Sequence, residues 1–206
     1  MTHKTGLEDY YIIRNNKKMR FGYTTGTCAA AASKAAAQML LSGEEIREIP
    51  FLTPKGILLN LEILHIEKGE DFVSCAVRKD AGDDPDMTDG LEIFSRVKKI
   101  RDSKIVLDGG PGVGRVTKKG LEQPVGNAAI NKVPRSMILK AVEDVCSEYD
   151  YEGGLEIIIS VPKGEEAARK TFNPRLGIQG GISILGTSGI VEPMSASALI
   201  KTTEVE

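Results

Sequence analysis

The sequence is poor in the residues that define several classes of protein. Among its 206 residues there is no tryptophan, and tyrosine and phenylalanine each occur only five times. Its three cysteines, Cys28, Cys75 and Cys146, are odd in number and far apart, which excludes a disulfide framework. Without such a framework a reducing cytoplasm is the simplest setting, so we expect a cytoplasmic protein.

An excess of one charge and long hydrophobic runs are also lacking. Lys and Arg number 27 against 29 Asp and Glu, a net charge of −2, which argues against a sequence-independent nucleic-acid binder. No window approaches eighteen apolar residues, so no membrane span is expected. Residues 1–9 lack the apolar core of a signal peptide. We therefore expect neither nucleic acid nor a membrane as partner.

Glycine is what the sequence has in quantity. Its 22 glycines gather mainly in three places, which is typical of tight turns and of backbone brought close to something. The three clusters are Gly22 and Gly26, then Gly109, Gly110, Gly112 and Gly114, and then Gly177, Gly180, Gly181, Gly186 and Gly189. The length and a hydrophobic content of 41% indicate a globular protein of one domain, or of one domain and a fragment of another.

The hydrophobic pattern predicts an α+β fold, a mixed sheet with packed helices. A buried helix is expected over 27–42, because only Lys34, Gln38 and Ser42 form a polar stripe and Gly43 can end the helix. Other helices are expected over 134–149, 163–171 and 195–202. Strands are expected over 48–52, 57–66, 71–78, 104–107, 155–161 and 182–185, whereas 91–100 fits a strand or a helix. This order does not give regular βαβ winding.

The first segment that could carry chemistry, residues 22–28, opens the buried helix. Thr25 or Thr27 is expected to cap it, and no Glu or Gln completes a capping box. Backbone amides near Thr24, Thr25, Gly26 and Thr27 are then left for a carboxylate or a phosphate. The alternative is a structural helix with nothing bound. Cys28 is either a first-turn thiolate or, as we favour, a small buried hydrophobic residue.

The second segment, residues 79–90, places five aspartates in one loop. Carboxylates this crowded repel one another unless they meet cations, protons or backbone donors. The EF-hand template fails, because Asp89 stands where its glycine would be, and no His or Cys is near enough for a transition metal. Ligand contact and a solvated turn remain equally open interpretations.

The third segment, residues 108–117, is rich in glycine and nearly fits two nucleotide-binding patterns. The P-loop pattern fails because Arg115 and Val116 stand at its Lys and Ser/Thr positions, and the dinucleotide pattern fails at Thr117. A backbone nest that cups an anion, with Arg115 adding donors, remains open beside a simple hairpin tip.

The fourth segment, residues 171–189, contains one strong charge in a long neutral stretch. That charge, Arg175, suits either substrate binding or a structural salt bridge.

Together these segments resemble one family. The stretches 22–28, 79–86, 112–117 and 172–177, followed by Glu192-Pro193-Met194-Ser195, are similar in sequence and order to the CbiD family, from about Met19 onward. The members of this family are cobalt-precorrin-5B C1-methyltransferases.

The resemblance implies a fold, a reaction and its reactants. The fold would be an α+β domain related to a permuted ribosomal S5 second domain, over 1–192, with the start of a truncated α/β domain at 193–206. The reaction would pass a methyl group from S-adenosylmethionine to carbon 1 of an anionic, cobalt-containing tetrapyrrole in anaerobic cobalamin biosynthesis. The cobalt would belong to the substrate, with no metal bound by the protein, and a homo-oligomer is left open.

Matching the residues to this chemistry gives hypotheses for their roles, with the cluster of aspartates as the motive for the catalytic ones. Asp83, Asp84 and Asp86 would be catalytic, by steadying the donor or accepting a proton. The candidates for binding substrate or donor are Thr24, Thr25, Gly26, Thr27, Cys28, Lys79, Asp80, Gly82, Gly110, Gly112, Gly114, Arg115 and Arg175. In the competing interpretation, the chain is a non-catalytic module that binds a tetrapyrrole or contacts a partner.

Overall fold

The computed structural model describes residues 3–194. The helix expected over 195–202, and the expected second domain apart from residues 193 and 194, lie outside the described residues. Four helices are present within this described range: α1 (Thr25–Ser42), α2 (Lys132–Glu148), α3 (Gly164–Ala168) and α4 (Asn173–Leu176). No helix within residues 3–194 is both long enough and apolar enough to cross a membrane.

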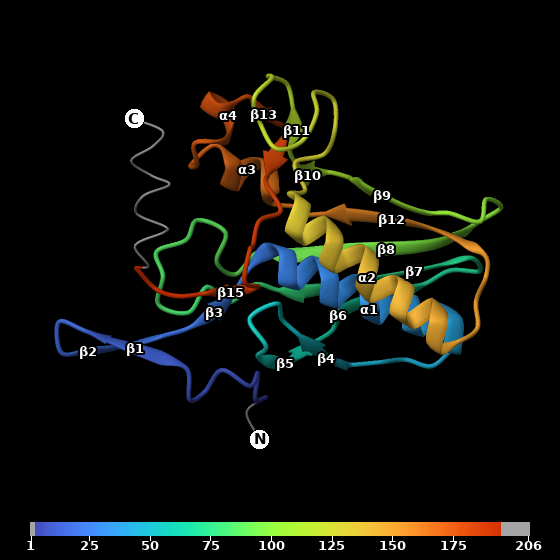
Figure 1. Ribbon diagram of the computed structural model, residues 1–206, viewed down its shortest axis with the longest axis horizontal. Coiled ribbons are helices and arrows are strands. Elements are labelled where there is room, and N and C mark those ends of the chain that lie inside the picture. The colour runs from blue at the N-terminus through green and yellow to red at the C-terminus, as the bar shows by residue number, and fades with distance from the viewer. Residues whose placement is uncertain (1–2, 195–206) are drawn as a thin grey trace.

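The body of the fold is one five-stranded mixed sheet with two long helices on it (Figure 1). Its strands, in spatial order, are β6 (Leu64–Lys68), β7 (Phe72–Arg78), β8 (Glu92–Ile100), β12 (Gly154–Ser160) and β9 (Ile105–Gly109). Neighbouring strands are antiparallel except β12 and β9, which are parallel. The expected α+β class with a mixed sheet is therefore confirmed.

Short strand pairs surround this sheet. They are β1 (Tyr11–Arg14) with β2 (Lys17–Arg20), β4 (Glu48–Leu52) with β5 (Leu58–Glu62), β10 (Gly112–Val113) with β14 (Gly181–Ile182), β11 (Arg115–Val116) with β13 (Ile178–Gln179), and β3 (Gly22–Tyr23) with β15 (Ile190–Val191). The last pair joins the beginning of the described chain to its end, and so fixes where α1 starts.

Helix α1 forms the centre of the core. Its alanines from Ala29 to Ala37 are all fully buried, and the helix packs against α2 on one side and β7 and β8 on the other. Residues of those strands are buried beneath it, among them Val73 in β7 and Ile93 and Val97 in β8. Because alanine is small and favours helix, the sequence both forms this helix and lets its neighbours approach closely.

The ends of α1 show one success and one error of the sequence analysis. Gly43 ends the helix in the left-handed conformation at φ +78°, as expected. The helix begins at Thr25, however, and Thr24 is its N-cap, accepting a hydrogen bond from the Thr27 amide at 3.2 Å. The expected caps, Thr25 and Thr27, are wrong because both side chains bind carbonyl groups of the last segment instead.

Several element boundaries also differ from expectation. The strand expected over 57–66 is two strands, β5 and β6, which pair with different partners and are separated at Ile63. His65, whose φ is +51°, lies within β6 where its register against β7 shifts. Residues 91–100 are a strand. The helix expected over 163–171 is confined to α3, and Asn173 and Pro174, expected to end it, begin α4. The strand expected over 182–185 is only the end of β14.

The hairpin β1–β2 was not predicted. Its turn residues Asn15 and Asn16 both have positive φ, 47° and 61°, as a two-residue turn between antiparallel strands requires. Asparagine tolerates this conformation better than most residues, so the Asn-Asn pair was the signal that could have identified the hairpin.

Candidate functional site

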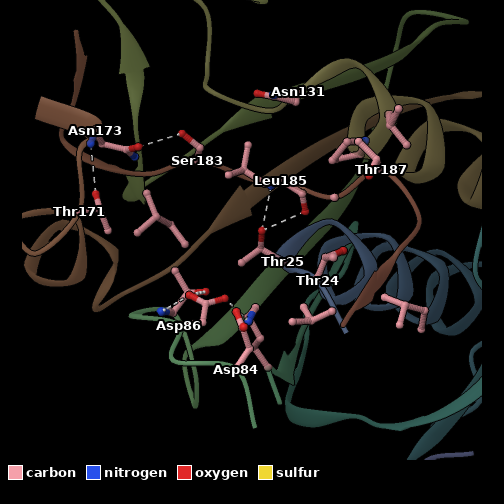
Figure 2. A pocket seen from close by; sticks show the side chains of 18 of the residues that line it. Thr24, Thr25, Asp84, Asp86, Asn131, Thr171, Asn173, Ser183, Leu185 and Thr187 are labelled. Atoms are coloured by element: carbon pink, nitrogen blue, oxygen red, sulfur yellow. Dashed lines mark hydrogen bonds and ion pairs between the residues drawn. The ribbon is translucent and has the colours of Figure 1, made fainter. Parts of the chain in front are cut away.

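A pocket of about 450 Å³ lies where three of the four singled-out segments meet. Its walls come from the start of α1, the loop between β7 and β8, the segment around the start of α2, and residues 171–192. Figure 2 shows Asp84 and Asp86 on one side of this pocket, Asn131, Asn173 and Ser183 on the other, and Thr25 with Leu185 between them. A volume of this size suits a small-molecule ligand.

The start of α1 contributes Thr24 and Thr25 to the pocket. The Thr25 hydroxyl donates to the Leu185 carbonyl at 3.2 Å and accepts from the Leu185 amide at 2.8 Å. The same carbonyl accepts from the Gly26 amide at 2.8 Å. The helix amides at Gly26 and Thr27 thus donate to acceptors inside the protein, and the expected anion site at this helix start stays a prediction that these two amides do not support.

The Asp loop contributes a buried ion pair to the pocket. The Lys79 ammonium lies 2.7 Å from Asp86 Oδ2, with only 2% of the lysine side chain exposed. Burial alone would raise the pKa of Asp86, but the Lys79 charge and hydrogen bonds from Lys79 and Thr88 outweigh it and hold the pKa below its ordinary value. Asp86 is therefore a carboxylate kept ionised at the pocket wall.

Asp84 also faces the pocket, and its Oδ1 accepts a hydrogen bond from the Met194 amide at 2.9 Å. This contact ties the Asp loop to the last described residue. Thr88, which belongs to the same loop, also lines the pocket, and its hydroxyl donates a hydrogen bond to Asp86 at 2.7 Å.

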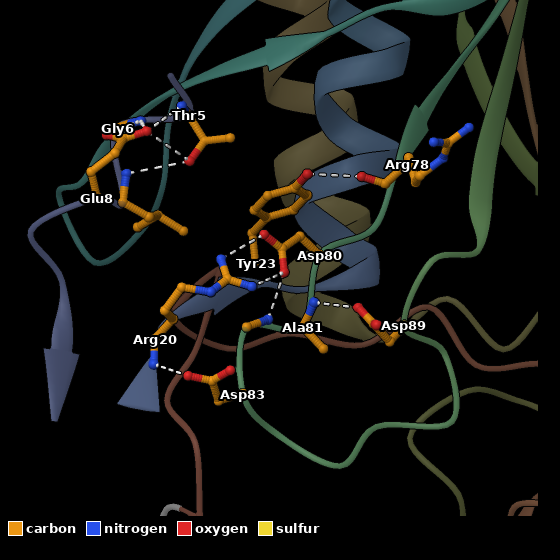
Figure 3. Close-up of polar contacts among 12 residues, drawn as sticks. Thr5, Gly6, Glu8, Arg20, Tyr23, Arg78, Asp80, Ala81, Asp83 and Asp89 are labelled. Carbon is orange, nitrogen blue, oxygen red and sulfur yellow. Dashed lines mark hydrogen bonds and ion pairs between the residues drawn. The ribbon is translucent and has the colours of Figure 1, made fainter. Parts of the chain in front are cut away.

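The other aspartates of the loop hold the loop itself (Figure 3). Asp80 binds the Arg20 guanidinium through both oxygens at 3.1 and 3.2 Å and accepts the Gly82 amide at 2.8 Å. Burial opposes ionisation of Asp80, yet its pKa is lowered by Arg20 and the Gly82 amide. Asp83 accepts the Arg20 amide at 2.6 Å. Neither Asp80, Gly82 nor Asp83 lines the pocket.

The Gly-rich third segment takes no part in the pocket. The Gly110 and Gly114 amides donate to the carbonyl groups of Ile159 and Ile182, at 2.7 and 2.8 Å. A side chain on Gly112 would meet the Val161 carbonyl oxygen at 1.8 Å. These glycines allow close packing of backbone, and the expected anion nest stays a prediction that these contacts do not support.

The arginines that were expected to bind substrate lie elsewhere. Arg115 makes a two-pronged contact with Asp108 at 2.7 and 2.8 Å and also donates to the Gly109 carbonyl at 2.6 Å, so its charge is paired within the protein. Arg175 does not line the pocket, and its guanidinium lies 6.0 Å from the centre of the Phe172 ring. Within residues 3–194 it has no ion-pair partner, so the salt-bridge alternative gains no support from the described part of the chain.

Cys28 and Thr27 are both fully buried. Burial raises the pKa of the Cys28 thiol to about 12, so the interpretation as a small buried hydrophobic residue is confirmed and contact with a ligand is not. The Thr27 hydroxyl donates to the Gly189 carbonyl at 2.7 Å, which is a structural role.

The sequence analysis missed much of the far wall. Asn131, Thr171, Asn173, Ser183 and Thr187 all line the pocket. Asn173 connects two of them, since its backbone amide donates to the Thr171 hydroxyl at 3.2 Å and its side-chain oxygen accepts from the Ser183 hydroxyl at 3.4 Å. The signal in the sequence was a concentration of hydroxyl and amide side chains in residues 171–187. From this stretch the sequence analysis had singled out Arg175 instead.

No group of three or more His, Cys, Asp or Glu side chains in residues 3–194 is placed to hold a metal ion. The pocket itself offers hydroxyl groups, amides and carboxylates. Such a lining can bind the polar groups and positive charge of a small molecule.

Comparison with known proteins identifies relatives along nearly the whole chain. The model of the family described as CbiD matches residues 12–193. The chain is 58% identical over 192 residues to a cobalt-precorrin-5B C(1)-methyltransferase of Ruminiclostridium cellulolyticum, covering 93% of this chain and 50% of the relative. It is 56% identical over 198 residues to one of Thermoanaerobacter sp., covering 96% and 53%. The chain thus spans about half the length of these curated relatives.

The fold has a counterpart among solved structures. A crystal structure of a cobalamin biosynthesis protein (cbiD) from Archaeoglobus fulgidus is 34% identical in sequence and superposes with a TM-score of 0.67. The match covers 95% of this chain and 62% of that one.

Proposed function

The chain belongs to the CbiD family, and from this premise we propose that it serves the transfer of a methyl group from S-adenosylmethionine to carbon 1 of cobalt-precorrin-5B. The family match over residues 12–193 carries this proposal. It is supported by the names of the relatives, which are cobalt-precorrin-5B C(1)-methyltransferases. The reaction belongs to anaerobic cobalamin biosynthesis, and we place it in the cytoplasm.

The pocket is the place we propose for a reactant of this transfer. Methyl transfer from a sulfonium to carbon depends on holding the two reactants in line more than on acid–base groups. A pocket whose hydroxyl and amide groups are fixed by hydrogen bonds, such as Thr25 and Asn173, supplies that kind of positioning. The cobalt enters with the substrate and needs no ligand from the protein.

Among the three aspartates proposed as catalytic, Asp84 and Asp86 face the pocket and Asp83 does not. We propose that Asp84 acts on the reactants directly, because its only partner within residues 3–194 is a backbone amide. Asp86 is committed to Lys79, and Asp83 supports the loop through the Arg20 amide.

We also propose a division of the chain. Residues 1–192 would form an α+β domain related to a permuted ribosomal S5 second domain, and residues 193–206 would belong to a following α/β domain. The support is that the relatives are about twice as long as their match to this chain.

Exchange of Asp84 tests the role of the pocket in methyl transfer. Asp84→Asn should lower turnover of cobalt-precorrin-5B roughly 100-fold, the size of effect seen when one electrostatic contact to a transition state is lost. The matched control is Asp71→Asn, since Asp71 pairs with Lys98 away from the pocket. Wild-type turnover in the Asp84 variant would contradict the assignment.

A second candidate function is a module that binds the tetrapyrrole without catalysing the transfer. The observation that favours it is again the half-length match to the relatives. Calorimetric titration with S-adenosylhomocysteine and, separately, with a corrinoid distinguishes the two. Binding of the donor product supports the enzyme, and binding of the corrinoid alone supports the module.

A further inference from the structure

The charges that line the pocket are unbalanced. Four carboxylates line it, and the only ammonium or guanidinium among the lining residues is that of Lys79. The carboxylates belong to Asp84, Asp86, Glu122 and Glu192. Lys79 is committed to Asp86 at 2.7 Å, so it leaves no positive charge for a ligand.

The other three carboxylates differ in their partners. Glu192 pairs with Lys55, which lies outside the lining. Asp84 accepts only the Met194 amide, and Glu122 accepts only the Asn131 side chain and the Lys132 amide. Within residues 3–194, therefore, Asp84 and Glu122 have hydrogen-bond donors but no cationic side chain.

The two uncompensated carboxylates come from opposite walls. Asp84 belongs to the loop between β7 and β8, whereas Glu122 is hydrogen-bonded to Asn131, which Figure 2 shows across the pocket from Asp84. A ligand between them meets negative charge from two directions. Apart from the ion-paired Lys79, Asp86 and Glu192, the rest of the lining is uncharged and includes the hydroxyl groups of Thr24, Thr88 and Thr187.

We propose that this pocket holds the cationic methyl donor and not the anionic macrocycle, and that its carboxylates prefer the sulfonium form of the donor to the demethylated product. The inference rests on the proposed function and assigns the two reactants to different places. Carboxylates attract a sulfonium and an ammonium and repel the acetate and propionate groups of the macrocycle. The macrocycle then approaches the mouth of the pocket from outside.

The transfer itself changes the charge that the pocket sees. The carbon nucleophile supplies an electron pair for the new C–CH3 bond, and the S–CH3 bond breaks with its electron pair kept by sulfur. The positive charge leaves the donor, passes to the macrocycle with the methyl group and is lost to water as a proton. A neutral thioether remains between the carboxylates, which lowers its affinity and favours its release.

Calorimetry of the chain with S-adenosylmethionine and with S-adenosylhomocysteine tests this inference. At about 50 mM salt we expect the methionine form to bind roughly tenfold more tightly, since each partly exposed charge contact contributes modestly. The preference should shrink at about 500 mM salt, where such charges are screened. Equal or tighter binding of the product at low salt would overturn the inference.

A matched pair of variants separates pocket charge from total charge. In the double variant Asp84→Asn and Glu122→Gln, the preference should fall to within about twofold, mainly through weaker binding of the methionine form. Glu165→Gln removes a carboxylate that pairs with Arg169 on α3, outside the pocket, and should keep the preference. An equal loss for both ligands in the double variant would contradict the proposal.

The outcomes also separate this inference from the proposed function. If a polycarboxylated corrinoid displaces the donor from the pocket while the chain still methylates its substrate, the inference falls and the function stands. If the preference is found but no methyl transfer occurs, the function falls and the pocket remains a site for a cationic ligand.

Discussion

At the scale of single residues, Lys79 is the side chain on which we expect stability to depend most. It is almost completely buried, its ammonium has one acidic partner, and its backbone amide and carbonyl join the two ends of the Asp loop. Removing one partner of a buried pair leaves the other charge without compensation, which costs more than the pair itself contributes.

Replacement of this lysine should therefore destabilise the protein and change its response to acid. Lys79→Met should lower the free energy of unfolding by about 3–5 kcal/mol at neutral pH, as measured by urea unfolding followed by circular dichroism. In the wild type, the Asp86 carboxyl takes up a proton near pH 3.8 in the unfolded chain, whereas in the folded protein its pKa is lower and it is protonated only at lower pH. Its contribution is thus present above pH 3.8 and is lost as the pH falls through the lowered folded pKa.

In Lys79→Met the main cause of that lowered pKa is gone, so the loss of stability on acidification should be shallower. The variant Asp86→Asn removes the titrating group and should flatten the same part of the curve. If both variants follow the wild-type pH dependence, the pair does not control the charge of Asp86.

Two glycines of the Asp loop offer a second test at this scale. Gly82 and Gly90 both have positive φ, 65° and 71°, but a side chain on Gly82 would meet the Arg20 carbonyl oxygen at 2.4 Å, whereas nothing lies within 4 Å of one on Gly90. Both alanine variants pay for the left-handed conformation, about 1–2 kcal/mol. Gly82→Ala should lose about 1–3 kcal/mol more by overpacking, measured by urea unfolding, and equal losses would contradict the close approach.

The residues of the site were predictable where charge made them conspicuous. Asp84, Asp86 and Lys79 were identified because five aspartates in one loop need an explanation. Ser183 and Asn173 were not, because a neutral polar side chain in a glycine-rich stretch looks the same whether it faces a ligand or water. Arg115 was expected to bind substrate because it is charged. Its partner within the protein, Asp108, is recognised only once the chain is folded.

At the scale of elements, α1 shows what local sequence can determine. Its burial and its end at Gly43 followed from composition, because a helix of mostly small and apolar residues with one narrow polar stripe is buried on most sides. Its start did not follow, because the choice among Thr24, Thr25 and Thr27 depends on Leu185 and Gly189, about 160 positions away.

The closeness of α1 to its neighbours gives a prediction for this element. Ala32 is fully buried and its carbonyl accepts the Cys75 thiol at 3.3 Å. Ala32→Leu should therefore lower the free energy of unfolding by about 1–3 kcal/mol through overpacking, measured by denaturant titration. Gln38→Leu, on the half-buried polar stripe, also introduces a leucine but with little change in volume, and should cost less than about 0.5 kcal/mol. A tolerant Ala32 would show that α1 and β7 are not tightly packed.

The strands were harder to predict than the helices. Residues 57–66 read as one apolar strand, but β5 pairs with β4 and β6 pairs with β7, so the chain changes partner within the run. A pattern of two-residue period identifies extended chain, but it carries no information on which neighbour each residue will meet.

At the scale of the whole molecule, the pocket depends on segments that are far apart in the chain. A ligand in it should therefore protect several of them at once. We expect S-adenosylhomocysteine to slow amide hydrogen exchange in peptides covering residues 79–88, 131–134 and 182–192 together, because a bound ligand opposes local opening of the walls it contacts. Peptides covering 140–148, at the far end of α2, are the control, and protection confined to one segment would contradict a shared pocket.

The pairing of β3 with β15 has a consequence for how the protein is made. Gly22 and Tyr23 leave the ribosome early, yet their partners Val191 and Ile190 are translated only after residues 24–189. At 5–20 residues per second, the nascent chain carries an unpaired β3 and a helix without its Leu185 contact for roughly 10–30 s. During that interval residues 190–192, which line the pocket, have not yet been synthesised. A pause in translation before residue 190 would lengthen the time for which β3 has no partner strand.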